Sequence, residues 1–128
     1  MMNTTEPTTQ AAMLLAASDI KGARVSNFQN QDVGEIDELL IEPEMGQIRF
    51  AILSVGGFLG LGSTRVAVPW PAFQIITERG KIKNMMLDAT KERLEKAPRI
   101  EGQNYERLYP AEAAEPIFLY WDVEWVEE

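Results

Sequence analysis

Apolar and polar residues alternate with a period of two through most of the stretch from residue 23 to residue 87. This period is typical of β-strands, and turn-forming residues interrupt it at short intervals. The pattern predicts six strands, over residues 23–27, 33–41, 48–55, 65–68, 73–77 and 82–87. The third of these is apolar on both faces, which indicates a strand covered on both sides or lying at the centre of a small closed barrel.

The second predicted strand changes its apolar phase halfway along. Ile36 falls on one face, whereas Leu39 and Ile41 fall on the other. A regular strand cannot bury all three side chains, and a β-bulge near Asp37 and Glu38 would realign them. Because bulges bend strands, this one favours a small, curved barrel. The segment 42–46, with proline early and glycine late, is a hairpin turn.

A glycine-rich crossing joins the third and fourth strands, with the sequence GGFLGLG at residues 56–62. Glycine permits the sharp turn that such a crossing needs. Phe58, Leu59 and Leu61 are unusually large and apolar for an exposed turn. We interpret them as folded over an apolar end of the barrel or held against a partner.

The order of these pieces resembles the PRC-barrel family. The matching stretches are DVGEIDELLIEPEMGQIRFAIL, then GGFLGLG, then VAVPW, and the resemblance covers residues 17–100. It implies a mainly β fold, a small and strongly bent antiparallel β-barrel of six strands. The family's barrel is shared by the photosynthetic reaction-centre H subunit and a ribosome maturation factor, so the resemblance also implies a module that holds macromolecules together.

The chain divides into three expected parts. Residues 1–12 are polar and rich in threonine, and we expect them to be disordered. Residues 13–100 form the barrel-like domain, including one short helix over Lys91–Ala97 with Asp88 or Thr90 as its N-cap. Residues 101–128 form an aromatic and acidic C-terminal extension.

Within the extension we expect one helical turn over 111–115, stopped by Pro116. Trp121, Val123 and Trp125 then alternate with acidic residues, which predicts a strand with one aromatic face. Such a strand has two interpretations. It docks into a partner's groove or exchanges with a second copy, or it packs on its own barrel and covers an apolar patch.

Composition removes several classes of function. The chain has no cysteine and no histidine, which excludes thiolate catalysis, histidine-dependent triads and the commonest metal ligands. The net charge of −8 argues against direct binding of nucleic acid, and no apolar run has the length of a membrane span. We therefore predict a cytoplasmic protein that is not an enzyme and has no cofactor.

The acidic residues of the second strand and its turn allow a different interpretation. Several converging carboxylates are what a Ca²⁺ site or a carboxylate-based hydrolase requires. We favour a solvated strand face instead, because charge runs usually mean solvation. The residues concerned are Asp32, Glu35, Asp37, Glu38, Glu42 and Glu44.

The sequence thus predicts a PRC-barrel adaptor that binds a protein partner. The alternative is a self-assembling structural protein, a homodimer or a higher homo-oligomer. The candidate contact residues lie in the glycine-rich crossing and in the extension: Phe58, Leu59, Leu61, Phe118, Tyr120, Trp121, Val123 and Trp125.

Overall fold

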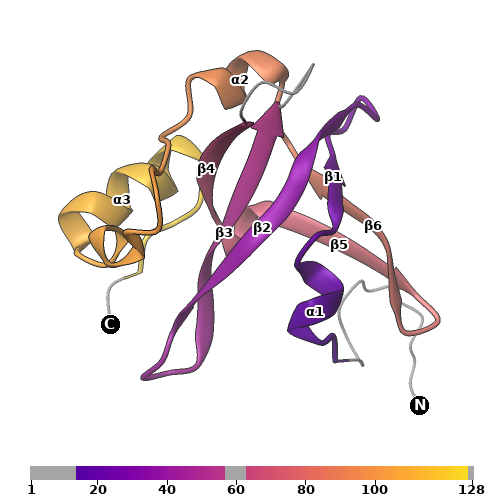
Figure 1. Cartoon of the computed structure of the whole chain (residues 1–128), viewed down its shortest axis with the longest axis horizontal. Coiled ribbons are helices and arrows are strands. Elements are labelled where there is room, and N and C mark those ends of the chain that lie inside the picture. The colour runs from indigo at the N-terminus through magenta and orange to yellow at the C-terminus, as the bar shows by residue number, and fades with distance from the viewer. Residues whose placement is uncertain (1–13, 57–62, 127–128) are drawn as a thin grey trace.

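The computed structural model describes residues 14–56 and 63–126, which contain one six-stranded sheet (Figure 1). The order of strands in the sheet is β4-β3-β2-β1-β6-β5. The strands are β1 (Arg24–Ser26), β2 (Asp32–Glu42), β3 (Gln47–Gly56), β4 (Ser63–Pro69), β5 (Phe73–Glu78) and β6 (Lys81–Leu87). All six predicted strands are therefore confirmed, as is the mainly β, barrel-like fold.

The sheet departs from a closed antiparallel barrel in two ways. β1 and β6 run parallel and share one paired position, Ser26 with Met86. The end strands β4 and β5 do not pair with each other in the described part of the chain; they are joined through a short 3-10 helix, η2 (Trp70–Ala72). The result is a strongly bent sheet whose seam lies between β4 and β5.

The bulge predicted in β2 is present. The register between β2 and β3 shifts between Ile36 and Glu38, and it shifts again between Leu40 and Ile41. Ile36 is fully buried, as expected. The expectation that Ile41 is buried with it is wrong, since Ile41 lies beyond the second shift and is 56% exposed.

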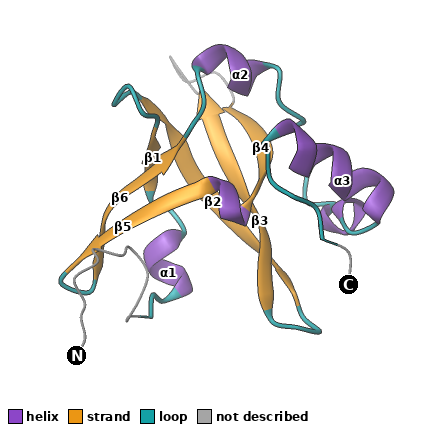
Figure 2. Ribbon diagram, turned by 180° about the vertical axis from the view of Figure 1, so that it is seen from behind, coloured by secondary structure: helices purple, strands orange, loops and turns teal. Residues whose placement is uncertain are grey.

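β3 is the centre of the core. Its residues 50–53 are all at most 1% exposed, so neither face of the strand meets water. Phe50 contacts Phe118 of α3 (Ala111–Tyr120), with ring centroids 5.4 Å apart. Figures 1 and 2 show α3 lying against the sheet beside β3 and β4, which explains why a strand in a largely antiparallel sheet is apolar on both faces.

The one expected short helix corresponds to α2 (Lys91–Glu95), which begins where predicted and ends two residues earlier. Thr90 is its N-cap, and the Thr90 hydroxyl accepts a hydrogen bond from the Arg93 backbone at 3.0 Å. The described residues also contain a four-residue helix, α1 (Ala17–Ile20), which the strand pattern did not predict. No helix among the described residues is long and apolar enough to cross a membrane.

Two expectations for the extension are wrong. The helix does not stop at Pro116, since α3 continues through it to Tyr120. Residues 121–126 form no strand. The side chains that α3 buries are Ala114, Ile117 and Phe118, and Trp121 follows at its C-cap. These positions follow the helical spacing i, i+3, i+4, i+7. Pro116 is exposed and lies outside this stripe, so burial of the stripe outweighs the one backbone hydrogen bond that proline cannot donate.

We predict that Gly34→Ala destabilises the fold by about 3 kcal/mol. Gly34 has a φ of +149°, and a Cβ there would lie 2.3 Å from the backbone oxygen of Ser54 on β3. The added methyl group would force β2 and β3 apart. Urea unfolding followed by circular dichroism measures the loss.

Gly46→Ala is the matched control for this prediction. Gly46 has a φ of +70° in the hairpin turn, but a Cβ there meets nothing within 4 Å. Its cost is the backbone strain alone, about 1 kcal/mol. Equal losses for the two variants would show that the close approach of β2 to β3 does not constrain position 34.

Candidate protein-interaction surface

Arg65 on β4 fastens the start of the C-terminal extension to the barrel. Its guanidinium donates hydrogen bonds to the carbonyl of Gly102 at 2.5 Å and to the hydroxyl of Tyr105 at 2.6 Å. It also donates to a carboxylate oxygen of Asp37 at 2.8 Å, which holds the guanidinium in place. The bond to Tyr105 and then the contact with Asp37 raise the pKa of Arg65, so the attachment keeps its charge at any physiological pH.

Arg93 on α2 fastens the C-terminal end of α3. It donates to the Tyr120 carbonyl at 2.6 Å, and the Tyr120 hydroxyl in turn donates to the Arg93 carbonyl. The guanidinium carbon lies 4.9 Å from the centre of the Trp121 ring, within range of a cation–π interaction. Arg93 of α2 and Tyr120 of α3 thus each donate a hydrogen bond to the other's backbone carbonyl, and the two bonds hold the helices together.

Arg49 on β3 makes the third attachment. Its guanidinium lies 5.5 Å from the ring centre of Tyr109 and 5.4 Å from that of Trp125. Trp125 also packs edge-on against Phe118, with centroids 5.0 Å apart. The last described part of the chain thus folds back over the same stretch of β3 that α3 covers.

These contacts place the predicted contact residues of the extension. Phe118 and Trp121 are 8% and 4% exposed, so they pack within the chain. Tyr120, Val123 and Trp125 are half-buried, so part of each side chain remains exposed to solvent. Phe58, Leu59 and Leu61 lie outside the described residues.

An apolar groove runs between the β2–β3 hairpin and the extension, and we call it the hairpin–extension groove. Its volume is about 330 Å³. Ile41 and Tyr109 at its rim are 56% and 62% exposed, a large apolar area for two neighbouring side chains. The residues that line it are Leu39, Leu40, Ile41, Glu42, Pro43, Arg49, Phe50, Tyr105, Glu106, Leu108 and Tyr109.

Sequence reasoning did not select Ile41, Arg49 and Tyr109 as contact residues. Ile41 was expected in the core because the sequence indicated one bulge in β2. The second shift, between Leu40 and Ile41, turns the Ile41 side chain outward. The available signal for Tyr109 was its position in an aromatic loop between Leu108 and Pro110. The selection of the extension as a contact region stays a prediction, and the groove adds Tyr109 to its predicted residues.

A sequence model of the PRC-barrel domain matches residues 13–94. The chain belongs to the PRC-barrel domain family. The match begins before α1 and ends within α2, so the C-terminal extension lies beyond the matched PRC-barrel region. A search of curated proteins found no significant match.

The acidic residues of the PRC barrel's second strand do not converge. Asp32 and Glu35 both contact Arg24, Asp37 contacts Arg65, and Glu38 contacts Lys21. The carboxylate of Glu42 accepts hydrogen bonds from the backbone of its own turn. Among residues 14–56 and 63–126, no three acidic side chains are grouped as a metal site requires.

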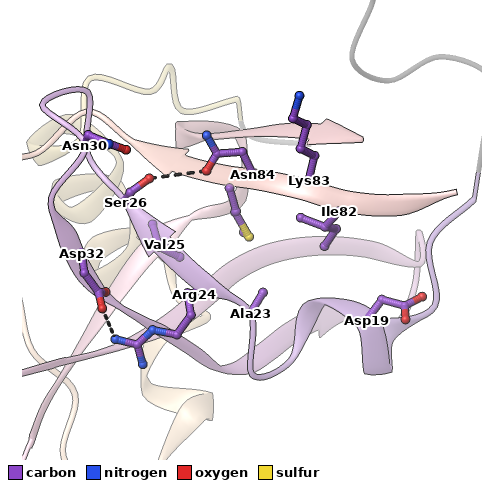
Figure 3. Close-up of a pocket in the computed structure, with 11 residues that line it drawn as sticks. Asp19, Ala23, Arg24, Val25, Ser26, Asn30, Asp32, Ile82, Lys83 and Asn84 are labelled. Atoms are coloured by element: carbon purple, nitrogen blue, oxygen red, sulfur yellow. Dashed lines mark hydrogen bonds and ion pairs between the residues drawn. The ribbon is translucent and has the colours of Figure 1, made fainter. Parts of the chain in front are cut away.

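A second hollow, of about 500 Å³, lies where β1 and β6 diverge beyond their single paired position. Figure 3 shows two pairs among its polar groups, Arg24 with Asp32 and Ser26 with Asn84. The hydrogen bond with Asp32 raises the pKa of Arg24.

We predict that Arg93→Ala loosens the extension from the PRC barrel and lowers stability by about 2 kcal/mol. The substitution removes the guanidinium from the Tyr120 carbonyl and from the Trp121 ring. Urea unfolding measures the loss of stability, and near-ultraviolet circular dichroism reports whether the rings of Tyr120 and Trp121 stay ordered.

Arg107→Ala is the matched control, because Arg107 lies on η3 (Tyr105–Leu108), is exposed and makes no side-chain contact that holds α3. Its change should stay within about 0.5 kcal/mol. If Arg93→Ala were equally mild, α3 would be held by its apolar stripe alone.

Proposed function

We propose that this chain is a non-enzymatic adaptor that binds a protein partner through the C-terminal extension and the hairpin–extension groove. The observation that carries the proposal is the groove itself, where Ile41 and Tyr109 are exposed beside a hydrophobic floor. Exposed apolar side chains gathered along one groove are characteristic of protein contacts. Membership of the PRC-barrel family, whose modules mediate assembly, supports the same function.

The charges around the groove indicate the chemistry of the partner. Between residues 101 and 126 the extension has six acidic residues and a single basic one, Arg107. Glu42 and Glu106 line the groove itself. A partner segment with apolar residues inside a ring of lysine and arginine would be complementary to this surface. The glycine-rich crossing, with Phe58, Leu59 and Leu61, stays a prediction from the sequence.

Self-assembly is the second candidate function. It is favoured by Leu14, which is 95% exposed and lies far along the chain from the groove. An apolar side chain so open to water gains from being covered by another molecule. The absence of histidine and cysteine and the paired carboxylates of β2 leave little support for the third alternative, a cation-binding protein or a carboxylate-based enzyme.

We expect substitution at the groove rim to abolish partner capture. The bait is full-length protein carrying Ile41→Ser and Tyr109→Ser, compared with the unchanged chain in a pull-down from lysate of the native cell. Both side chains are exposed, so the fold should tolerate the changes. Captured proteins are identified by mass spectrometry, and capture by the unchanged chain should weaken as salt is raised.

Phe28→Ser is the matched control, because Phe28 is 49% exposed and lies in the turn between β1 and β2, away from the groove. It should capture the same partner as the unchanged chain. A partner that all three baits retain equally would exclude the groove. Deleting the extension would be a poor test, since Phe118 and Trp121 are part of the core.

A further inference from the structure

Arg49 is the one half-buried arginine in the described part of the chain whose guanidinium meets no oxygen acceptor there. The other two, Arg65 and Arg93, each donate to a backbone carbonyl and to a carboxylate. The guanidinium of Arg49 instead lies beside two aromatic rings, those of Tyr109 and Trp125. A ring face attracts the positive charge, but it supplies no oxygen to the N–H donors of the guanidinium.

A guanidinium without a carboxylate partner is unusual in this chain, because carboxylates are in excess. The sequence has 20 acidic and 12 basic residues. Glu42 and Glu106 line the hairpin–extension groove together with Arg49, yet neither carboxylate forms an ion pair with it. Arg49 and Tyr109 both line the groove, and the guanidinium lies 5.5 Å from the Tyr109 ring centre. An acceptor inside the groove can therefore reach it.

The aromatic contacts hold this guanidinium in position. Trp125 packs against Phe118 with ring centroids 5.0 Å apart, and Phe118 packs against Phe50 of the core at 5.4 Å. Arg49 is thereby tied to the core through rigid groups. An arginine held in this way loses little rotamer freedom when it binds a ligand, so more of the interaction energy appears as affinity.

A second apolar hollow shows that a charge at the wall is not a general feature of this surface. The hollow lies beside β5, has a volume of about 480 Å³ and includes Ile48, Phe73 and Ile75 in its lining. None of the described residues that line it is charged. The hairpin–extension groove differs in having a cation at its wall, and charge complementarity then restricts what can occupy it.

We propose that the hairpin–extension groove binds a segment of the protein partner with aspartate or glutamate at its centre, whose carboxylate pairs with Arg49. A guanidinium binds a carboxylate through two parallel hydrogen bonds between opposite charges, which an amide or a hydroxyl cannot reproduce. The apolar lining receives the residues on either side of the acid. This inference rests on the proposed function, since it names the central contact of the same groove.

The acidic rim favours a side-chain carboxylate over the end of a chain. Glu42 is on β2 at one wall of the groove, and Glu106 is on η3 at the other. Basic residues on both sides of the central acid can pair with these two carboxylates. This arrangement needs a segment that continues past Arg49 in both directions, with the pattern basic, apolar, acidic, apolar, basic.

The test compares two peptides by NMR titration of the full-length, isotope-labelled chain. The probes are acetyl-Lys-Leu-Glu-Leu-Lys-amide and the same peptide with glutamine in place of glutamate, so only the first has a carboxylate. The glutamate peptide should shift the resonances of the Arg49 Nε–H and the Trp125 indole N–H. It should bind at least about fivefold more tightly than the glutamine peptide.

Arg49→Met removes the guanidinium and keeps an unbranched apolar side chain, so the preference for glutamate should disappear. Arg49→Lys keeps the charge but not the planar, two-pronged geometry, and should retain only part of the preference. Arg107→Met is the matched control: it removes the same charge from an exposed position on η3 outside the groove lining, and the preference should remain.

Melting temperatures verify that the Arg49 variants fold. Should Arg49→Met not fold, the comparison of the two peptides on the unchanged chain decides, because it needs no variant. A third probe, acetyl-Lys-Leu-Gln-Leu with a free carboxyl end, separates the two sources of a carboxylate. Tighter binding of this probe than of the glutamate peptide would assign Arg49 to a chain terminus and exclude the side chain.

Equal affinity of the glutamate and glutamine peptides would overturn the proposal, as would the absence of any shift at Arg49 or a preference that Arg49→Met retains. The fate of the adaptor function is separate. Equal binding of both peptides with shifts at Ile41 and Tyr109 would leave the groove as a docking site and remove only the carboxylate contact. Partner capture that is insensitive to the rim substitutions would instead exclude the groove, whatever the peptides do.

Discussion

The burial of α3 against β3 is the contact on which the rest of this structure depends. Phe118 meets Phe50, the central aromatic residue of the core, and Trp121 closes the same interface. Without α3, one face of β3 would be open to water, and an apolar strand in a bent sheet would become an aggregation hazard. Because an apolar interface alone is non-directional, the arginine contacts supply the orientation: Arg93 fixes the end of the helix and Arg65 fixes the segment that leads into it.

The fold was largely predictable, because its determinants are local in sequence. Strand alternation, the turn at 42–46 and the bulge after Ile36 are visible without knowing what any residue contacts. α3 was missed for a physical reason. Its stripe of Ala114, Ile117, Phe118 and Trp121 has helical spacing, but Pro116 within it argued for a stop, and the alternation of Trp121 to Trp125 argued for a strand. Tertiary burial decided between these signals.

The candidate surface was predictable as a region and not as a set of residues. The concentration of aromatic and acidic residues after position 100 identified the extension. Which aromatic side chains stay open depends on long-range partners: Trp121 is under Arg93 of α2, and Trp125 is beside Arg49 of β3. The sequence of the extension alone does not predict these contacts with other elements. It likewise does not predict that β4 and β5 remain unpaired.

The hairpin–extension groove and the hollow beside β5 adjoin the same part of the β2–β3 hairpin, because Ile41 lines the groove and its cross-strand partner Ile48 lines the hollow. The groove is apolar with an acidic rim, whereas residues 73–77 of β5 are uncharged. Figure 1 shows the extension and the β5–β6 hairpin on opposite sides of the sheet, so the β2–β3 hairpin is the part of the barrel that the groove and the hollow share.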